Sequence, residues 1–355
     1  MCRIVDQEQL HGMGLMLMKE ISNRFQKAFL LALVGLLSAA NVAYSTPSTP
    51  DSIRQVRDLM AKSAADLDLA QAKLTIDRLI DPSIDTAATL RQLDELAAIV
   101  RSGFPPNASN RQKLEALLIF LYQPGPWNEG QPFTYDLADP LGKNIRNKLL
   151  PTYLATRKGN CVSMPILVAI LGQKLGLPVT LATAPEHVLV KYRDDSREWL
   201  NVEATAGGYE TNAGYERRTG ISKKAIANQI YLRPLDQREA VAVMLSTLME
   251  FYRNHGQITQ EMAIANFALE VNPKDVVALL HKGSGYYTLL QERYVSRYPT
   301  PADIPIDQRQ DYRMLSQENL RLFAQAEALG WTEPTQAKNE SYLQSIEREK
   351  AHRGK

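Results

Sequence analysis

Cys161, His187 and Glu203 are the side chains of this sequence whose types and order could perform covalent chemistry. A deprotonated cysteine thiol is a strong nucleophile, and a nearby histidine can take its proton and later pass a proton to the leaving group. A carboxylate beside the histidine orients the ring and stabilises its charged form. These three residues therefore predict a site that forms and breaks acyl bonds through a thiol.

Cys161 is expected in the first turn of a buried helix. Gly159 and Asn160 form a turn before it, apolar residues at helical spacing follow as far as Leu175, and a Gly-Leu-Pro sequence ends the pattern. The N–H groups and the positive dipole end of a first helical turn favour a thiolate. The same N–H groups could stabilise an oxyanion during acyl transfer.

The pattern after this helix predicts strands that bring His187 and Glu203 together. If His187 lies opposite Glu203 in an antiparallel pair, Val188 lies opposite Val202, and the apolar residues share the buried face. This register needs a loop of odd length between the second and third strands, such as Asp194 to Ser196. The predicted strands cover residues 179–184, 187–192 and 198–204.

A loop-rich segment with Pro, Gly and aromatic residues covers positions 123–139. Such loops often lie over or beside a site, so Trp127, Phe133 and Tyr135 are candidates for a substrate cleft, together with Asn160. The alternative is that these aromatic side chains fasten the loop to the core.

The N-terminal segment differs from the rest of the chain. Lys19, Arg24 and Lys27 precede an apolar run over 28–37, and small residues follow, which predicts a signal peptide within residues 1–45 and a periplasmic or secreted bacterial protein. An uncleaved anchor is the alternative. Removal of this segment also removes Cys2 and leaves Cys161 as the sole cysteine. A single thiol in an oxidising compartment is a candidate reactive group, although a small buried apolar side chain is the alternative.

The composition limits the partners. The chain has 355 residues with 41 Lys plus Arg against 39 acids, so it has no charge excess that would indicate nucleic acid or an anionic membrane. No short-spaced pair of ligands such as HxxxH indicates a metal, and no motif indicates a cofactor. We expect a peptide or protein substrate, and no membrane contact beyond the signal segment.

The remaining periodicity is mostly helical. We predict a helical N-terminal region over 46–122, a core over 123–225, a helical region resembling a tetratricopeptide repeat over 226–297, and a linker with C-terminal helices over 298–355. The segment 242–273 matches one 34-residue repeat at five offsets and offers a possible protein-binding surface. A structural tail packed on the core is the alternative. The five matching positions are Leu248, Tyr252, Gly256, Ala268 and Pro273.

The segments GNCVSMPIL, APEHVLVKY and NVEATAGG resemble the bacterial transglutaminase-like superfamily, in the branch with a helical N-terminal region and a tetratricopeptide-like tail. The resemblance covers roughly residues 65–210. It implies an α+β fold with a papain-like core, in which the helix bearing the cysteine packs on an antiparallel sheet. By position, the family's cysteine, histidine and acid fall on Cys161, His187 and Glu203. The acid is more often Asp in this family, and many members of the branch have lost the cysteine that this chain keeps.

The resemblance implies thiol acyl chemistry on a peptide or amide bond and leaves the reaction open. Hydrolysis is favoured over transfer because the sequence has no visible feature for an amine acceptor. The main alternative is a catalytically inert module that binds a protein in the cell envelope. Less favoured is a metal site formed by Cys161, His187 and Glu203, because these ligands are widely spaced.

Overall fold

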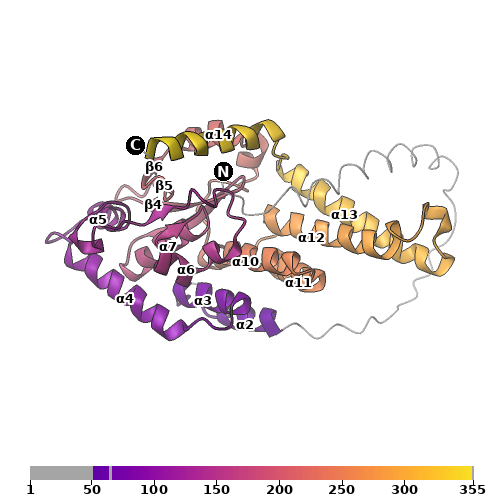
Figure 1. The fold of residues 1–355 in the computed structure, drawn as a ribbon, viewed down its shortest axis with the longest axis horizontal. Helices are drawn as coiled ribbons and strands as arrows, with labels where there is room; N and C mark the ends of the chain where they lie inside the picture. Colours follow the sequence, from indigo (N-terminus) through magenta and orange to yellow (C-terminus); the bar gives the residue numbers. More distant parts are fainter. Residues whose placement is uncertain (1–50, 64–65, 354–355) are drawn as a thin grey trace.

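The computed structural model describes residues 51–63 and 66–353. The predicted signal segment, residues 1–45, lies outside the described residues. Figure 1 shows the strands β4 to β6 above the helix α7, with α4 and α5 on the left and the pair α12 and α13 extending to the right. The helix α14 lies above the strands in this view.

The first half of the chain forms short helices and two small strands before the central helix. Their bounds are α2 (Asp51–Met60), α3 (Leu69–Ile80), α4 (Thr86–Ser102), α5 (Asn110–Tyr122), the 3-10 turns η1 (Pro126–Asn128) and η2 (Ile145–Lys148), β1 (Thr134–Tyr135), α6 (Leu150–Thr156), β2 (Lys158–Gly159) and α7 (Ser163–Lys174).

The second half forms a sheet followed by helices. Their bounds are β3 (Val179–Ala184), β4 (His187–Arg193), β5 (Trp199–Glu203), β6 (Gly208–Glu210), α8 (Asn212–Thr219), α9 (Lys223–Ala227), α10 (Gln237–Asn254), α11 (Ile258–Val271), α12 (Val276–Leu290), the π turn η3 (Gln291–Val295), the 3-10 turns η4 (Pro301–Asp303) and η5 (Ile306–Gln308), α13 (Arg309–Leu329) and α14 (Gln336–Arg353).

Capping residues set the starts of the N-terminal helices. The carboxylates of Asp68 and Asp85 accept hydrogen bonds from the first turns of α3 and α4, and Ser109 forms a capping box with Gln112 at the start of α5. Each cap satisfies N–H groups that have no partner inside the helix. The helices predicted from the spacing of apolar residues in this region are confirmed.

The main sheet has four antiparallel strands in the order β3-β4-β5-β6. The three predicted strands are confirmed, while β6 was missed because three residues are too few for an alternating pattern to be read. A separate parallel pair, β1 with β2, joins Tyr135 to Gly159 and so fastens the loop over 123–139 beside the start of α7.

The predicted register between β4 and β5 is wrong by two residues. The structure pairs Val190 with Val202 and Lys191 with Asn201, so Glu203 does not lie directly opposite His187. Side chains alternate between the two faces of a strand, so a register shift of two residues leaves every residue on the same face. The predicted faces are therefore right, although the predicted pairing is wrong. The N–H of Asp194 donates to Glu198 O and the N–H of Arg197 donates to Asp194 O. These bonds close a three-residue loop over 195–197, one residue further along the chain than the expected loop over 194–196.

The helix α7 lies at the centre of the core, and all of its residues from Ser163 to Gly172 are buried. It packs on β3 and β4 and is contacted by α3, α4, α5 and α6. A Cβ at Gly172 would lie 2.5 Å from a methyl carbon of Val179, so the glycine permits close approach of helix and sheet. This packing fixes the direction in which the start of α7 points.

The C-terminal helices pack in sequence order, α10 on α11, α11 on α12 and α12 on α13. The predicted repeat falls on α10 and α11, and its assignment as a tetratricopeptide repeat stays a prediction. The helix α14 returns to the core, where the hydroxyl of Tyr342 donates to the carbonyl of Pro140 at 2.9 Å and lies 2.9 Å from the hydroxyl of Tyr135.

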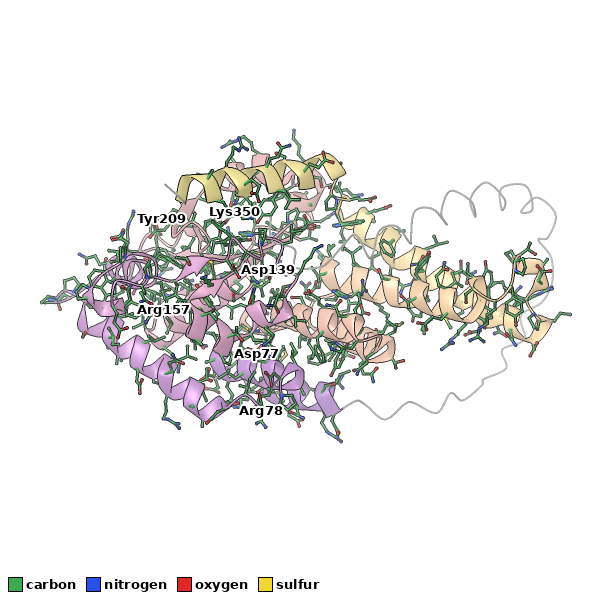
Figure 2. The ribbon with its side chains drawn as sticks, viewed as in Figure 1. Asp77, Arg78, Asp139, Arg157, Tyr209 and Lys350 are labelled. Atoms are coloured by element: carbon green, nitrogen blue, oxygen red, sulfur yellow. The ribbon has the colours of Figure 1, made fainter. Side chains whose placement is uncertain are left out.

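Buried charges join the parts of the fold. Lys148 of η2 and Glu250 of α10 form a buried ion pair at 2.5 Å, which connects segments about a hundred residues apart. On α3, Asp77 lies inside the molecule, where its carboxylate accepts from the N–H of Leu150 at 2.8 Å, while Arg78 is exposed (Figure 2).

Within the described ranges, no helix is both long enough and apolar enough to cross a membrane.

Candidate active site

The side chain of Asn160 organises the start of α7. Its Oδ1 accepts from the N–H of Val162 at 3.0 Å and of Ser163 at 3.1 Å, and its carbonyl accepts from the N–H of Met164. Cys161 therefore lies in the turn directly before α7, two residues ahead of its first residue Ser163, and not within the first helical turn as predicted. The sequence predicted that N–H groups at the start of this helix could stabilise an oxyanion. This is wrong for the N–H groups of Val162 and Ser163, because both already donate a hydrogen bond to Oδ1 of Asn160.

Cys161 carries a buried, reduced thiol with 1% of the residue exposed. Its Sγ donates to the carbonyl oxygen of Glu186 at 3.7 Å. Glu186 directly precedes His187, so the contact brings the start of α7 to the start of β4. The sequence could not provide this approach, because no local pattern specifies which strand a helix end meets.

Glu186 lies in the tight turn between β3 and β4. The turn contains Pro185 and Glu186, and the flanking residues Ala184 and His187 pair with each other. Glu186 has a φ of 56°, a left-handed conformation that costs a residue with a side chain about 1 kcal/mol. The turn presents one carbonyl to Cys161 and begins the strand that carries His187.

His187 and Glu203 are in direct contact. The Nε2 of His187 lies 2.8 Å from Oε2 of Glu203, and both residues are buried. Because the register differs from the predicted one, the two side chains meet along a diagonal between neighbouring strands, a separation that long side chains can bridge. With Nε2 directed at Glu203, Nδ1 is the ring nitrogen that remains for a thiol.

Glu203 is held as a carboxylate by several donors. Its Oε2 accepts from the hydroxyl of Tyr215 at 2.7 Å and from Arg218 at 3.0 Å, and its Oε1 accepts from the N–H and the hydroxyl of Thr205. Burial by itself opposes ionisation, but attraction to His187 and these hydrogen bonds outweigh it. The pKa of Glu203 therefore lies well below its ordinary value.

Thr205, Tyr215 and Arg218 complete the surroundings of Glu203, and sequence reasoning missed all three. Thr205 lies two residues after Glu203, a spacing typical of a side chain that bonds its neighbour's carboxylate. Tyr215 and Arg218 are three residues apart on α8 and so share one face of that helix. The sequence signal that could have identified Tyr215 and Arg218 is their i, i+3 spacing on the helix that follows the predicted acid.

The four candidate cleft residues occupy different environments. Trp127 is 41% exposed, and Phe133 is buried, with its ring 5.1 Å from that of Tyr153 in an edge-on packing. Tyr135 donates its hydroxyl to the carbonyl of Pro140, and Asn160 is buried as the cap of α7. The structure therefore places Phe133 in the core and Asn160 beside Cys161.

No metal site accompanies these residues: in the part of the chain that the structure describes, no group of three or more His, Cys, Asp or Glu side chains could hold a metal ion. Nucleophilic acyl chemistry needs a thiol, a histidine that takes its proton and an acid that orients the histidine. The structure shows the contact of His187 with Glu203 and that of Cys161 with the carbonyl of Glu186, the residue before His187.

The comparison with protein families bears on this geometry. Residues 87–246 match the model described as the Transglutaminase-like superfamily. Comparison with curated proteins and with solved structures gave no match. The matched segment begins in α4, ends in α10, and contains the central helix, the sheet and all three candidate residues. Residues 87–246 of this chain therefore form a transglutaminase-like domain.

Proposed function

We propose that this protein is a thiol enzyme that cleaves a peptide or amide bond through Cys161, His187 and Glu203, with hydrolysis favoured over transfer to an amine. One observation carries the proposal: the thiol at the start of α7 contacts the turn from which His187 extends, and the ring of His187 binds an ionised Glu203. The family match over residues 87–246 supports a cysteine-type enzyme fold.

Each residue has a role in this proposal. His187 takes the proton of Cys161, and the resulting thiolate attacks the carbonyl carbon of the substrate to form a tetrahedral intermediate. Its collapse breaks the C–N bond, and His187 gives the proton to the leaving amine. Water then attacks the thioester, its proton passes to His187, and the acid product leaves as the thiol is restored. Glu203 holds the ring in orientation and balances its positive charge.

We propose that the protein is exported, as the charged and apolar pattern within residues 1–45 favours. The helical region from α10 onward would then serve either as a protein-binding surface of the tetratricopeptide type or as a support for the domain. Helix pairs that pack in sequence order support the first possibility.

The alternative is a catalytically inert transglutaminase-like protein that binds a partner in the cell envelope. The burial of Cys161, with its thiol directed at a backbone carbonyl, favours this alternative, because a substrate must reach the sulfur before it can react.

Thiol reactivity decides between the two. The rate of iodoacetamide alkylation of Cys161 is measured against pH in the wild type and in His187→Ala, with Cys161→Ala as the blank. An enzyme predicts a midpoint clearly below the free-thiol value of about 8.5 and a return toward that value in His187→Ala. A midpoint near 8.5 in both proteins, with slow alkylation throughout, supports the inert module instead.

A further inference from the structure

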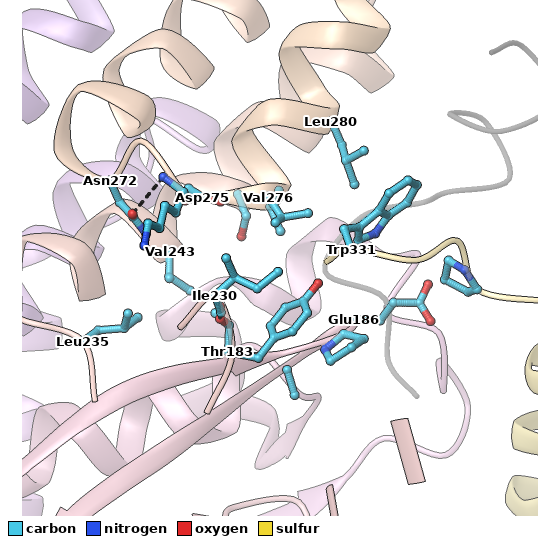
Figure 3. Close-up of a pocket in the computed structure, with 17 residues that line it drawn as sticks. Thr183, Glu186, Ile230, Leu235, Val243, Asn272, Asp275, Val276, Leu280 and Trp331 are labelled. Carbon is cyan, nitrogen blue, oxygen red and sulfur yellow. Dashed lines mark hydrogen bonds between the residues drawn. The ribbon is translucent and has the colours of Figure 1, made fainter. Parts of the chain in front are cut away.

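The turn before α7, which carries Cys161, is held between two segments. On one side, the thiol donates to the carbonyl of Glu186, whose own turn also lines a pocket together with Asp275 and Trp331 (Figure 3). On the other side lies the segment over 134–147, which contains β1, a loop and most of η2. This second side holds the chain around Cys161 through a series of hydrogen bonds.

The strand β1 joins the segment over 134–147 to the residues that lead to Cys161. Tyr135 pairs with Gly159 in the parallel pair of β1 and β2. The N–H of Asp136 donates to the carbonyl of Gly159 at 2.8 Å. Since Gly159 is two residues before Cys161, a shift of Asp136 reaches the thiol along a short stretch of backbone.

The side chain of Asn147 ties the two ends of this segment together. Its Nδ2 donates to Oδ2 of Asp136 at 3.1 Å and to Oδ2 of Asp139 at 3.0 Å. An amide nitrogen carries two hydrogens, so it can serve both carboxylates at once. The carboxylates are themselves fixed by the backbone, because Oδ1 of Asp136 accepts from the N–H of Ala138 at 2.9 Å and Oδ1 of Asp139 from that of Lys143 at 2.8 Å.

The residue that follows Asn147 anchors the same stretch of backbone to the C-terminal helices. Lys148 forms its buried ion pair with Glu250 of α10 at 2.5 Å. The backbone of Asn147 is therefore held on one side by its own side chain and on the other by its neighbour.

The carbonyl of Asn147 determines which way the amide of Asn160 faces. It accepts from Nδ2 of Asn160 at 3.4 Å. Because a carbonyl only accepts, the nitrogen of the amide faces Asn147 and the oxygen faces α7. There, Oδ1 of Asn160 accepts from the N–H groups of Val162 and Ser163. Asn160 is fully buried, and a reversed amide would place its nitrogen against two N–H donors.

From these contacts we infer that Asn147 is a positioning residue of the candidate active site. Its side chain is held by Asp136 and Asp139, and its carbonyl orients the amide of Asn160. That amide in turn fixes the backbone on both sides of Cys161. The inference rests on the proposed function only for the effect on the thiol, because the orientation of the Asn160 amide does not depend on catalysis.

The orientation of the amide is tested by hydrogen exchange at the N–H groups of Val162 and Ser163 in the full chain. Asn147→Ala removes both donors to the carboxylates, so exchange at these two groups should quicken by about 3- to 10-fold, as for the loosening of one hydrogen bond. Asn147→Asp keeps the size but sets a third carboxylate beside two others. It should act in the same direction, and it replaces the alanine variant if that variant does not fold.

Asn144→Ala is the matched control. Asn144 is an exposed asparagine of the same loop, and its Oδ1 accepts from the N–H of Arg146 at 3.1 Å. The substitution loosens this loop without removing a donor to either carboxylate, so exchange at Val162 and Ser163 should stay as in the wild type. Unchanged exchange in the Asn147 variant, or a rise by the same factor throughout α13, would overturn the inference.

The effect on the thiol is tested with iodoacetamide, with each pH profile read against its own plateau so that a change in access does not alter the midpoint. We expect the midpoint of Asn147→Ala to move toward the free-thiol value of about 8.5, with a thiolate fraction at pH 7 about threefold smaller than in the wild type. A purely structural residue would leave the midpoint of the folded protein in place. A low wild-type midpoint that does not move in Asn147→Ala would overturn the inference.

Failure of this inference is distinguishable from failure of the proposed function. A wild-type midpoint near 8.5 that does not respond to His187→Ala removes the enzyme, while the exchange measurement still decides whether Asn147 orients the amide. A low midpoint that depends on His187, with unchanged exchange at Val162 and Ser163, removes the role of Asn147 alone.

Discussion

The thiol of Cys161 points at the carbonyl oxygen of Glu186, 3.7 Å away, and so meets the turn that leads into His187. This contact joins two segments 25 residues apart and sets the sulfur at the edge of the sheet. Because the carbonyl accepts a hydrogen, the contact suits the neutral thiol, and it must break when the thiolate forms and attacks.

The first prediction concerns Cys161→Ala. It should abolish hydrolysis of amide or peptide substrates, with a loss of at least about 10³-fold, because the proposed mechanism has no covalent step without the thiol. The free energy of unfolding should change by only about 1 kcal/mol, since the lost group is one small buried atom. Progress curves and urea unfolding measure the two effects. Residual activity within tenfold of the wild type would assign the chemistry to another residue.

The sequence was sufficient to identify the candidate residues and the faces on which they lie. Alternation along β4 and β5 placed His187 and Glu203 on the same face, and helical spacing placed Cys161 at the start of α7. The register was wrong by two residues because a pattern of period two is unchanged by that shift. The loop bonds of Asp194 that fix the register depend on side-chain and backbone geometry, which the order of residues does not reveal.

The second prediction concerns Glu203→Gln. Turnover should fall by about 10²- to 10⁴-fold, because a neutral amide no longer stabilises a charged histidine. Glu203 also contributes stability through its lowered pKa. This contribution is present above the ordinary value of 4.5 and is lost as the pH falls through the lowered pKa.

The free energy of unfolding of the wild type should therefore exceed that of Glu203→Gln most at neutral pH, and the difference should shrink below pH 4.5. Denaturant titrations across this range measure it, with Glu198→Gln as the exposed control. A difference that grows toward acid would contradict the assignment of Glu203 as an ionised carboxylate.

The third prediction concerns Tyr215→Phe. The hydroxyl of Tyr215 donates to Glu203 at 2.7 Å and touches no reacting atom, so Tyr215 is a positioning residue. Its loss should lower kcat by about 3- to 10-fold and leave KM unchanged, since one hydrogen bond to a charged acceptor is removed and the ring still packs. The exposed Tyr209→Phe is the control. A change in KM alone would place Tyr215 at the substrate instead.

The fourth prediction concerns Lys191, which is 2% exposed and lies on the face of β4 that carries His187. Its pKa falls from the ordinary 10.5 to about 8 because burial disfavours the charged form. Across the strand lies Asn201, whose Oδ1 is buried without a hydrogen-bond partner among the described residues. At neutral pH the desolvation of the charged Lys191 ammonium group therefore lowers the free energy of unfolding.

Lys191→Met should raise the free energy of unfolding at neutral pH by about 1–2 kcal/mol, by removing that cost. Below pH 8 both folded and unfolded chains hold the proton, so the gain is constant. Between pH 8 and 10.5 only the unfolded chain holds it, so the wild type becomes more stable and the gain shrinks. Unfolding curves at several pH values measure this, with Lys223→Met as the exposed control. A gain that is independent of pH would mean that Lys191 is not desolvated.

The fifth prediction concerns the buried pair of Lys148 and Glu250, which joins the segment before α6 to α10. Lys148→Met should destabilise the protein by about 3–5 kcal/mol, because the charge of Glu250 stays buried without this cation. The double variant with Glu250→Met should recover most of the loss, since an apolar pair of similar size avoids the desolvation of both charges. Chemical unfolding of the four proteins completes the double-mutant cycle.

The exposed pair of Arg111 and Glu115 serves as the control for this cycle, and Glu115→Gln should cost less than about 0.5 kcal/mol because solvent screens the charges. If Lys148→Met costs no more than Glu115→Gln, the pair does not hold α10 to the domain. If the single and double variants are equally unstable, the loss comes from packing rather than from the buried charge. If the double variant regains most of the lost free energy of unfolding, apolar side chains can replace the ion pair. The contact between η2 and α10 then depends on the packing of side chains rather than on their charges.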